Sequence, residues 1–270
     1  MTKDLFSEVM QTATLRLLKL HFGATAGHIG GNLSSLDAMV YLQTVAMTEA
    51  DLFVLSKGHA AGALYVSLWA AGKLTEEDLQ TYGQDGSFLA AHPAANWHPD
   101  IPFMTGSLGH GISLAAGVAL GWKRQGRSGR VYCLLSDGEL QEGSCWEALV
   151  FSVQNRLDNL LILVDHNGLQ GFGAVKDVAA PMLPLAEKFN AFGLPCREID
   201  GHSFQDLESS LNDTPLSTGP QVIIMRTVKG HGISFMADKM EWHYLPMTDE
   251  LYSQAVNEVL AKGIDAKRGV

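Results

Sequence analysis

Two apolar runs separated by one helix-length segment constrain the fold of this chain most strongly. Val131–Leu135 ends abruptly in Asp137-Gly138, and Leu160–Val164 ends in Asp165-His166-Asn167-Gly168. Residues 142–154 between them are rich in good helix formers and long enough to cross over between two parallel strands. The sequence therefore predicts a strand-helix-strand unit that releases polar residues at the carboxyl end of each strand. Ligands of open parallel sheets bind outside those ends.

The polar groups after these strands suit a metal ion and a phosphorylated ligand. Asp137 and Asn167 offer hard oxygen ligands, and the backbone carbonyl of Leu169 would complete the protein's share of a Mg2+ or Ca2+ shell. Gly138 lets a backbone N–H approach an anion. An Asp-Gly pair after a strand is often only a turn. The pairing of two such strand ends is what indicates a metal-diphosphate site.

Composition limits the kinds of partner and compartment. The chain has 270 residues, 46% of them hydrophobic, which is enough to bury one substantial core. A net charge of −10 argues against nucleic acid and against anionic membrane surfaces as partners. No apolar run approaches the ~20 residues of a membrane span, and the start of the chain lacks a signal-peptide pattern.

The cysteines and the absence of linkers complete this general description. Cys133, Cys145 and Cys196 are odd in number and have no Cys-x-x-Cys spacing, so we expect a cytoplasmic protein. The sequence contains no internal repeat, no low-complexity segment and no linker. We therefore expect a single domain over residues 1–270.

A glycine-rich turn near the start of the chain carries the first candidate histidine. The periodicity of Leu5–Phe22 predicts a helix, which leads into the turn that contains His28. A second amphipathic helix follows, and we expect Ser35 to be its N-cap. Glycine on both sides of His28 indicates close approach to the backbone. The alternative is a loop histidine exposed by accident.

Three further segments combine glycine with histidine. The segment Phe53-Val-Leu-Ser-Lys-Gly-His reads as a short strand, a turn, and His59 at the start of a helix, whose N-terminus favours anions. The segment Thr105-Gly-Ser-Leu-Gly-His-Gly opens a small-residue helix but lacks the spacing of a dinucleotide fingerprint. The continuous apolar segment Gln221–Val228 indicates a buried parallel strand, and it leads into Lys-Gly-His-Gly and then Glu-Trp-His243.

Together these segments resemble the transketolase family of thiamine diphosphate enzymes. Asp137 and Asn167 are similar to its metal signature, with Ser136 in place of the first glycine. The Ser-Lys-Gly-His segment resembles the family's most distinctive tag, and the turn around His28 resembles its Ser-Gly-His-Pro-Gly turn. The resemblance covers roughly residues 5–262. It implies an α/β fold in which helices cover both faces of a doubly wound, mostly parallel sheet, as in the family's diphosphate-binding (PP-type) domain.

The resemblance implies a role for each matching residue. Asp137, Asn167 and the Leu169 carbonyl would hold the metal, Mg2+ or Ca2+. Four histidines would be catalytic. His28, His92 and His243 would carry out proton transfers and form hydrogen bonds with developing alkoxides, and His59 would lie at the phosphate end of the cofactor. The implied contacts with thiamine diphosphate are His59, Gly106, Ser107, Leu108, Gly138, Glu139, Asn167, His243 and Glu142.

Three of the polar residues have simpler interpretations. Glu142 would lie between two cofactor sites across a dimer, but a glutamate there is also a common first-turn charge on a helix, and both interpretations remain open. We expect His166 to face away from the metal. His202 matches the family's Asp-Gly-His turn, in a structural role.

The family pattern also implies a partner. A complete transketolase continues into pyrimidine-binding and C-terminal domains, so the resemblance implies the N-terminal subunit of a heteromeric transketolase, active only with a C-terminal subunit. It would move a two-carbon ketol unit between sugars or sugar phosphates, in a dimer of heterodimers. Two alternatives are the alpha subunit of a thiamine-dependent 2-oxo acid dehydrogenase or decarboxylase, and a noncatalytic nucleotide- or metal-binding Rossmann-like protein. Tyr244, His110 and a short loop before Phe53 depart from the family and leave substrate identity open.

Overall fold

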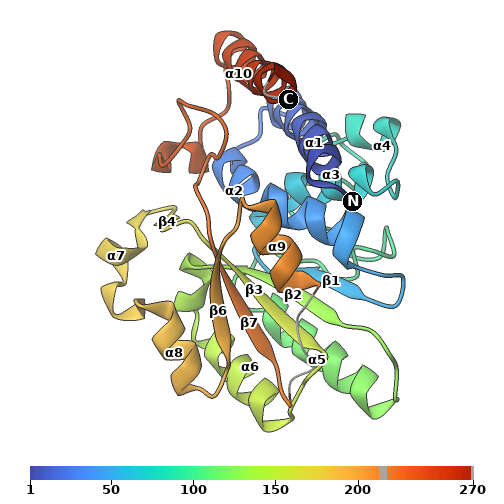
Figure 1. Ribbon diagram of the computed structural model, residues 1–270, viewed down its shortest axis with the longest axis vertical. Coiled ribbons are helices and arrows are strands. Elements are labelled where there is room, and N and C mark those ends of the chain that lie inside the picture. The colour runs from blue at the N-terminus through green and yellow to red at the C-terminus, as the bar shows by residue number, and fades with distance from the viewer. Residues whose placement is uncertain (213–217, 269–270) are drawn as a thin grey trace. The chain divides into compact units, whose positions relative to one another are not determined.

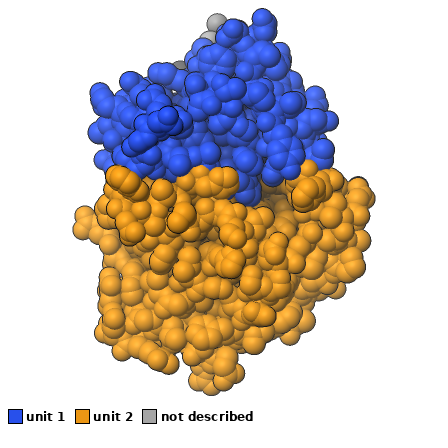
Figure 2. Space-filling model, turned by 180° about the vertical axis from the view of Figure 1, so that it is seen from behind, with its two compact units in different colours: residues 1–45, 59–91, 228–270 blue, residues 46–58, 92–227 orange. Residues whose placement is uncertain are grey.

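The chain divides into two compact units (Figure 2). The computed structural model describes residues 1–212 and 218–268, with the backbone alone for 263–268. The helical unit comprises residues 1–45, 59–91 and 228–270, and the sheet unit comprises residues 46–58 and 92–227. Each unit is described by itself, and a single domain over residues 1–270 stays a prediction.

Five parallel strands form the core of the sheet unit (Figure 1). Their order across the sheet is β1-β2-β3-β7-β6. Because every neighbouring pair is parallel, all five carboxyl ends meet at one edge. This confirms the predicted α/β fold with a mostly parallel sheet. The strands are β1 Leu52–Leu55, β2 Val131–Ser136, β3 Leu160–His166, β6 Cys196–Asp200 and β7 Gln221–Arg226.

Helices connect and cover these strands. The helices α5, α6 and α8, whose bounds follow, pack against alternate side chains of the central strands, such as Cys133 and Leu135 on β2 and Ile162 and Val164 on β3. The helices of this unit are α5 Gly111–Arg124, α6 Gly143–Gln154, α7 Val175–Val178, α8 Leu185–Ala191 and α9 Phe204–Leu211, with 3-10 turns Gly138–Gln141 and Ala180–Met182. A short antiparallel pair, β4 Leu169–Gln170 and β5 Gly173–Ala174, follows β3. The predicted crossover helix is thus confirmed as α6.

The helical unit is built around a buried helix. Every residue of α2 is buried, and α2 packs against α1, α3 and the 3-10 turn η5. The helices of this unit are α1 Lys3–Gly23, α2 Ile29–Tyr41, α3 Ala61–Ala70, α4 Glu76–Gln80 and α10 Asp249–Arg268, with η5 at Met240–His243. A π-helical turn, Leu42–Ala46, and a 3-10 turn, Gly58–Ala60, lie where the two units join along the chain. In the described parts of the chain, no helix is long and apolar enough to cross a membrane.

The prediction that the second helix begins after Ser35 is wrong. The helix α2 already begins at Ile29, and the Ser35 hydroxyl donates to the carbonyl of Gly31 within it. Glycine is a poor helix former, so local propensity argues against this start. Tertiary packing overrides it, since a Cβ on Gly30 would lie 3.0 Å from Cγ of Lys229. The helix needs glycine there because another segment of the chain packs directly against its backbone.

Candidate active site

Asp137 lies at the carboxyl end of β2 and is almost fully buried. Its Oδ1 accepts from the Gly138 amide at 2.8 Å, and its Oδ2 accepts from the Gly168 amide at 2.7 Å. The same Oδ2 lies 2.9 Å from Nδ1 of His166. The expectation that His166 faces away is therefore wrong. Its hydrogen bond to the Asp137 carboxylate raises the pKa of His166.

Asn167 is held by hydrogen bonds to both ends of its amide. Its Oδ1 accepts from the Leu169 amide at 3.0 Å, and its Nδ2 donates to Asp165 Oδ2 at 3.3 Å. Asp165 is fully buried in an ion pair with Lys57, and its other oxygen accepts from the Thr227 hydroxyl. Since a carboxylate only accepts, Asp165 determines which side of the Asn167 amide points toward it.

Two loops of the sheet unit pack backbone against backbone. A Cβ on Gly58 would lie 2.6 Å from the Gly106 nitrogen and from the Thr105 carbonyl carbon. Gly106 has a φ of +134°, and a Cβ there would lie 2.6 Å from the ring of His92. The structure thus brings His92 together with Gly106, both predicted site residues. Burial lowers the pKa of His92, which favours its neutral imidazole.

Glu139 joins the same loops from inside the protein. Its fully buried Oε1 accepts from the Ser56 hydroxyl at 2.5 Å and from the Gly109 amide at 2.9 Å, and its Oε2 accepts from the Ser136 amide at 3.3 Å. Burial raises the pKa of Glu139. The Glu139 side chain thus points into these loops. Its contact with the cofactor remains a prediction.

Other predicted cofactor residues lie on the surface of the sheet unit. Ser107 and Glu142 are exposed, and Leu108 is half-buried. Glu142 is the N-cap residue of α6, which the structure describes in full, but its side chain makes no capping hydrogen bond to that helix. The two interpretations of Glu142 stay open.

The residues at the strand ends fit a metal-diphosphate group. Two buried atoms, Thr105 Oγ1 and Gln170 Nε2, have no hydrogen-bond partner among the described residues. A buried polar atom left unpaired is costly, so such atoms indicate a place for a ligand or water. Gln170 also lies against Gly138, where a Cβ would be 2.9 Å from Gln170 Oε1. Hard oxygens for a cation and unused polar groups beside glycine amides are therefore available in the same unit.

Three predicted histidines form a cluster in the helical unit. The ring centroids of His28 and His243 are 4.9 Å apart, and His59 lies 5.6 Å from His28 and 5.7 Å from His243. The ring of Tyr244, which is 56% exposed, lies 4.7 Å from that of His243. We call His28, His59 and His243 the histidine cluster. His92 belongs to the sheet unit.

Two polar residues that the sequence analysis did not single out hold the cluster. Asn32 Nδ2 donates to the carbonyls of His28 and His59, at 2.8 and 3.0 Å. Lys229 Nζ lies 2.9 Å from His243 Nδ1. Lys229 stands in the Lys-Gly-His-Gly segment and Asn32 lies four residues after His28, but neither position along the chain indicates these contacts.

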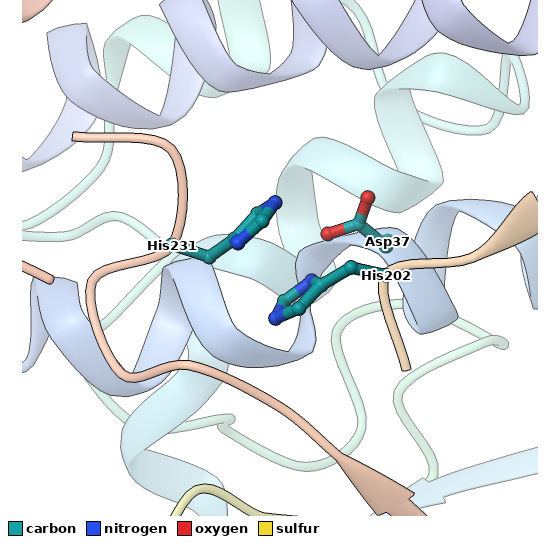
Figure 3. A group of neighbouring side chains, drawn as sticks. All are labelled: Asp37, His202 and His231. Atoms are coloured by element: carbon teal, nitrogen blue, oxygen red, sulfur yellow. The ribbon is translucent and has the colours of Figure 1, made fainter. Parts of the chain in front are cut away.

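A cavity of about 490 Å³ lies elsewhere in the helical unit, lined by residues of α1, α2 and α10. Asp37 on α2 and His231 line it and face one another (Figure 3). The third residue in that view, His202, belongs to the sheet unit, where its amide donates to Asp200 in a turn. The cavity-lining residues that the structure describes include none of the predicted site residues.

Comparison with known proteins decides the family. Residues 23–260 match the family described as transketolase, thiamine diphosphate binding domain. The chain belongs to the transketolase family. It is 37% identical over 235 residues to a subunit of the apulose-4-phosphate transketolase of Actinobacillus succinogenes, covering 83% of this chain and 85% of that protein. It is 35% identical over 247 residues to a 6-deoxy-6-sulfo-D-fructose transketolase subunit of a Clostridium species, covering 88% and 90%.

Solved transketolase structures have the same fold. The transketolase of Campylobacter jejuni superposes with a TM-score of 0.87 at 26% identity, covering 96% of this chain and 43% of that one. The chain therefore spans less than half the length of that transketolase, whereas it matches most of each of the two proteins named as transketolase subunits. These matches confirm the prediction of the N-terminal, thiamine diphosphate-binding subunit of a split transketolase, which is a transferase. They favour it over both alternatives.

Proposed function

We propose that this chain binds the metal and the diphosphate of thiamine diphosphate, and supplies active-site histidines for two-carbon ketol transfer from a ketose donor to an aldose acceptor. The observation that carries the proposal is the convergence of His28, His59 and His243 from three separate segments of a transketolase-family chain. Imidazoles donate and accept protons near neutral pH, as this transfer requires.

Asp137, Asn167 and the Leu169 carbonyl hold the metal, Mg2+ or Ca2+, in this proposal. A carboxylate ligand is usually oriented by hydrogen bonds such as those from Gly138 and Gly168, and its oxygens keep further lone pairs for the ion. Gly106, Ser107, Leu108, Gly138 and Glu139 line the cofactor. When bound, thiamine diphosphate supplies the electron sink that ketol transfer requires.

The histidines divide the proton work. His28, His92 and His243 exchange protons or hydrogen bonds with the substrate oxygens, and His59 contacts the phosphate end. The lowered pKa of His92 leaves its imidazole neutral at pH 7, which suits a proton acceptor. Glu142 connects two cofactor sites across a dimer.

A partner subunit completes the enzyme. It carries the pyrimidine-binding and C-terminal domains, and two such pairs assemble as a dimer of heterodimers. Relatives of this chain are named for apulose 4-phosphate and for 6-deoxy-6-sulfo-D-fructose. We infer a ketose substrate that bears an anionic group. Tyr244, whose ring lies beside that of His243, narrows the channel through which this substrate reaches the histidine.

The test is calorimetric titration of thiamine diphosphate with Mg2+ into the full chain, alone and with its partner subunit. We expect tight binding only in the presence of the partner, with loss of binding in Asp137→Ala. The control is Asp85→Ala, which removes an exposed carboxylate outside the predicted site. No binding in either mixture would contradict the proposal, as would an Asp137→Ala chain that binds as the native one does.

A further inference from the structure

A buried lysine, Lys229, lies within hydrogen-bond distance of the His243 imidazole. Lys229 is 1% exposed, and its Nζ lies 2.9 Å from His243 Nδ1. A lysine ammonium has three donors and no lone pair, so the lysine donates and Nδ1 accepts. A ring nitrogen that accepts carries no proton. A His243 ring that accepts at Nδ1 from a Lys229 ammonium is neutral, with its single proton on Nε2.

Both partners of this hydrogen bond are anchored on the N-terminal turn of α2. The amide of Gly230, next to Lys229, donates to the Gly30 carbonyl at 2.9 Å. The carbonyl of His243 accepts from the His28 amide, also at 2.9 Å. A Cβ on Gly30 would lie 3.0 Å from Cγ of Lys229, so the lysine stem rests directly on the helix. Two segments are thus held on one rigid element, which fixes the distance between ammonium and ring.

A neutral imidazole with its proton on Nε2 has one defined capacity at that nitrogen. It donates a hydrogen bond and does not accept a proton there. The adjacent ammonium polarises the ring and makes the Nε2–H a better donor to an oxygen on which negative charge develops. The rings of His28 and His59 lie beside that of His243, at centroid distances of 4.9 and 5.7 Å.

We propose that Lys229 is a positioning residue that holds His243 as the neutral Nε2–H tautomer, so that His243 serves as a hydrogen-bond donor to the substrate oxygen and not as a base. This rests on the proposed function, in which His243 contacts the substrate. The work of accepting protons then falls to other histidines, such as His92.

The tautomer is measured directly by NMR of the full chain labelled with 15N in its histidine rings, with the His243 signals assigned by their loss in His243→Gln. We expect a protonated Nε2 and a hydrogen-bonded, unprotonated Nδ1 in the native chain and in Lys229→Arg, which keeps a donor. Lys229→Met should lose the hydrogen-bond shift of Nδ1. The matched control is Lys239→Met, an exposed lysine on the same loop.

Either of two NMR results would overturn the proposal. One is a proton on Nδ1 of the native chain at neutral pH, and the other is an unchanged Nδ1 resonance in Lys229→Met. Should Lys229→Met fail to fold, the native and Lys229→Arg spectra still decide the tautomer. This measurement needs no ketol transfer, so its outcome is independent of whether the proposed activity is found.

A double-mutant cycle in the assembled enzyme tests whether the lysine acts through the histidine. We expect Lys229→Met to lower kcat by about 10-fold or more with little change in KM, because the lost interaction acts on the transition state. In a His243→Gln background, the same substitution should have no further effect. Equal losses in both backgrounds would mean that Lys229 acts elsewhere, which would refute its role as a positioning residue.

Discussion

Replacing Gly58 by alanine tests the close packing of the two loops in the sheet unit. The new Cβ would lie 2.6 Å from the Gly106 nitrogen and the Thr105 carbonyl carbon, whereas ordinary contact begins at 3.4 Å. The loops must therefore separate by about 0.8 Å, the difference between these distances. Both obstacles are backbone atoms, so no flexible side chain can move aside. Overpacking of this kind costs roughly 1–3 kcal/mol of unfolding free energy.

The same displacement should weaken cofactor binding, because Gly106 belongs to the proposed cofactor site. A loss of about 1.4 kcal/mol in binding corresponds to a tenfold higher Kd. Urea unfolding and calorimetric titration of thiamine diphosphate measure the two effects separately. The matched control is Gly117→Ala on α5, where nothing lies within 4 Å of the new Cβ and helix propensity favours alanine by up to about 1 kcal/mol. A Gly58→Ala protein with native stability and native affinity would refute the packing argument.

Three further predictions follow from buried charge, a buried histidine and the aromatic residue beside the cluster. Asp165→Leu leaves the Lys57 ammonium buried without its carboxylate and should lower the free energy of unfolding, measured in urea, by about 3–5 kcal/mol. The control Asp158→Leu, at an exposed ion pair with Lys123, should change that free energy by less than about 1 kcal/mol. Equal losses in the two variants would contradict the prediction. Burial lowers the pKa of His21 from 6.5 to about 4, so its contribution to stability, present above pH 6.5, should be lost as the pH falls toward 4. The loss should reach about 3 kcal/mol and be absent in His21→Gln, and unfolding curves with the same pH slope for both proteins would refute it. Tyr244→Gly, which removes the exposed ring beside His243, should raise kcat/KM for bulkier ketoses, and an unchanged ratio of kcat/KM between a bulky and a small donor would exclude Tyr244 from substrate selection.

Periodicity predicted the centre of the sheet unit well because β2, β3 and β7 are buried on both faces. Buried parallel strands are continuous apolar runs, and Val131–Leu135, Leu160–Val164 and Gln221–Val228 correspond to β2, β3 and β7. Once these strands are parallel, their carboxyl ends share one edge. The placement of Asp137 and Asn167 after neighbouring strands is therefore a consequence of topology alone.

The helical unit was harder to predict, since its decisive contacts join segments far apart in the chain. Local propensity places the start of α2 after its glycines, yet the helix begins at Ile29 because Lys229 and Trp242 pack on Gly30. Nothing near Gly30 in the sequence reports that a segment two hundred residues later needs the space. The same separation hid the donors that hold the histidine cluster, Asn32 and Lys229.

The sequence by itself determined the α/β class, the strand ends that carry oxygen ligands, and the set of histidines, because burial periodicity and residue chemistry are local properties. Only the tertiary structure decided where the polar side chains point. It turned Glu139 inward to join two loops to the end of β2, set His166 against Asp137, and paired Lys57 with Asp165. Burial makes each unpaired polar group costly, so partners are chosen by whichever groups the fold brings within hydrogen-bond distance. That choice is made in space and cannot be read from spacing along the chain.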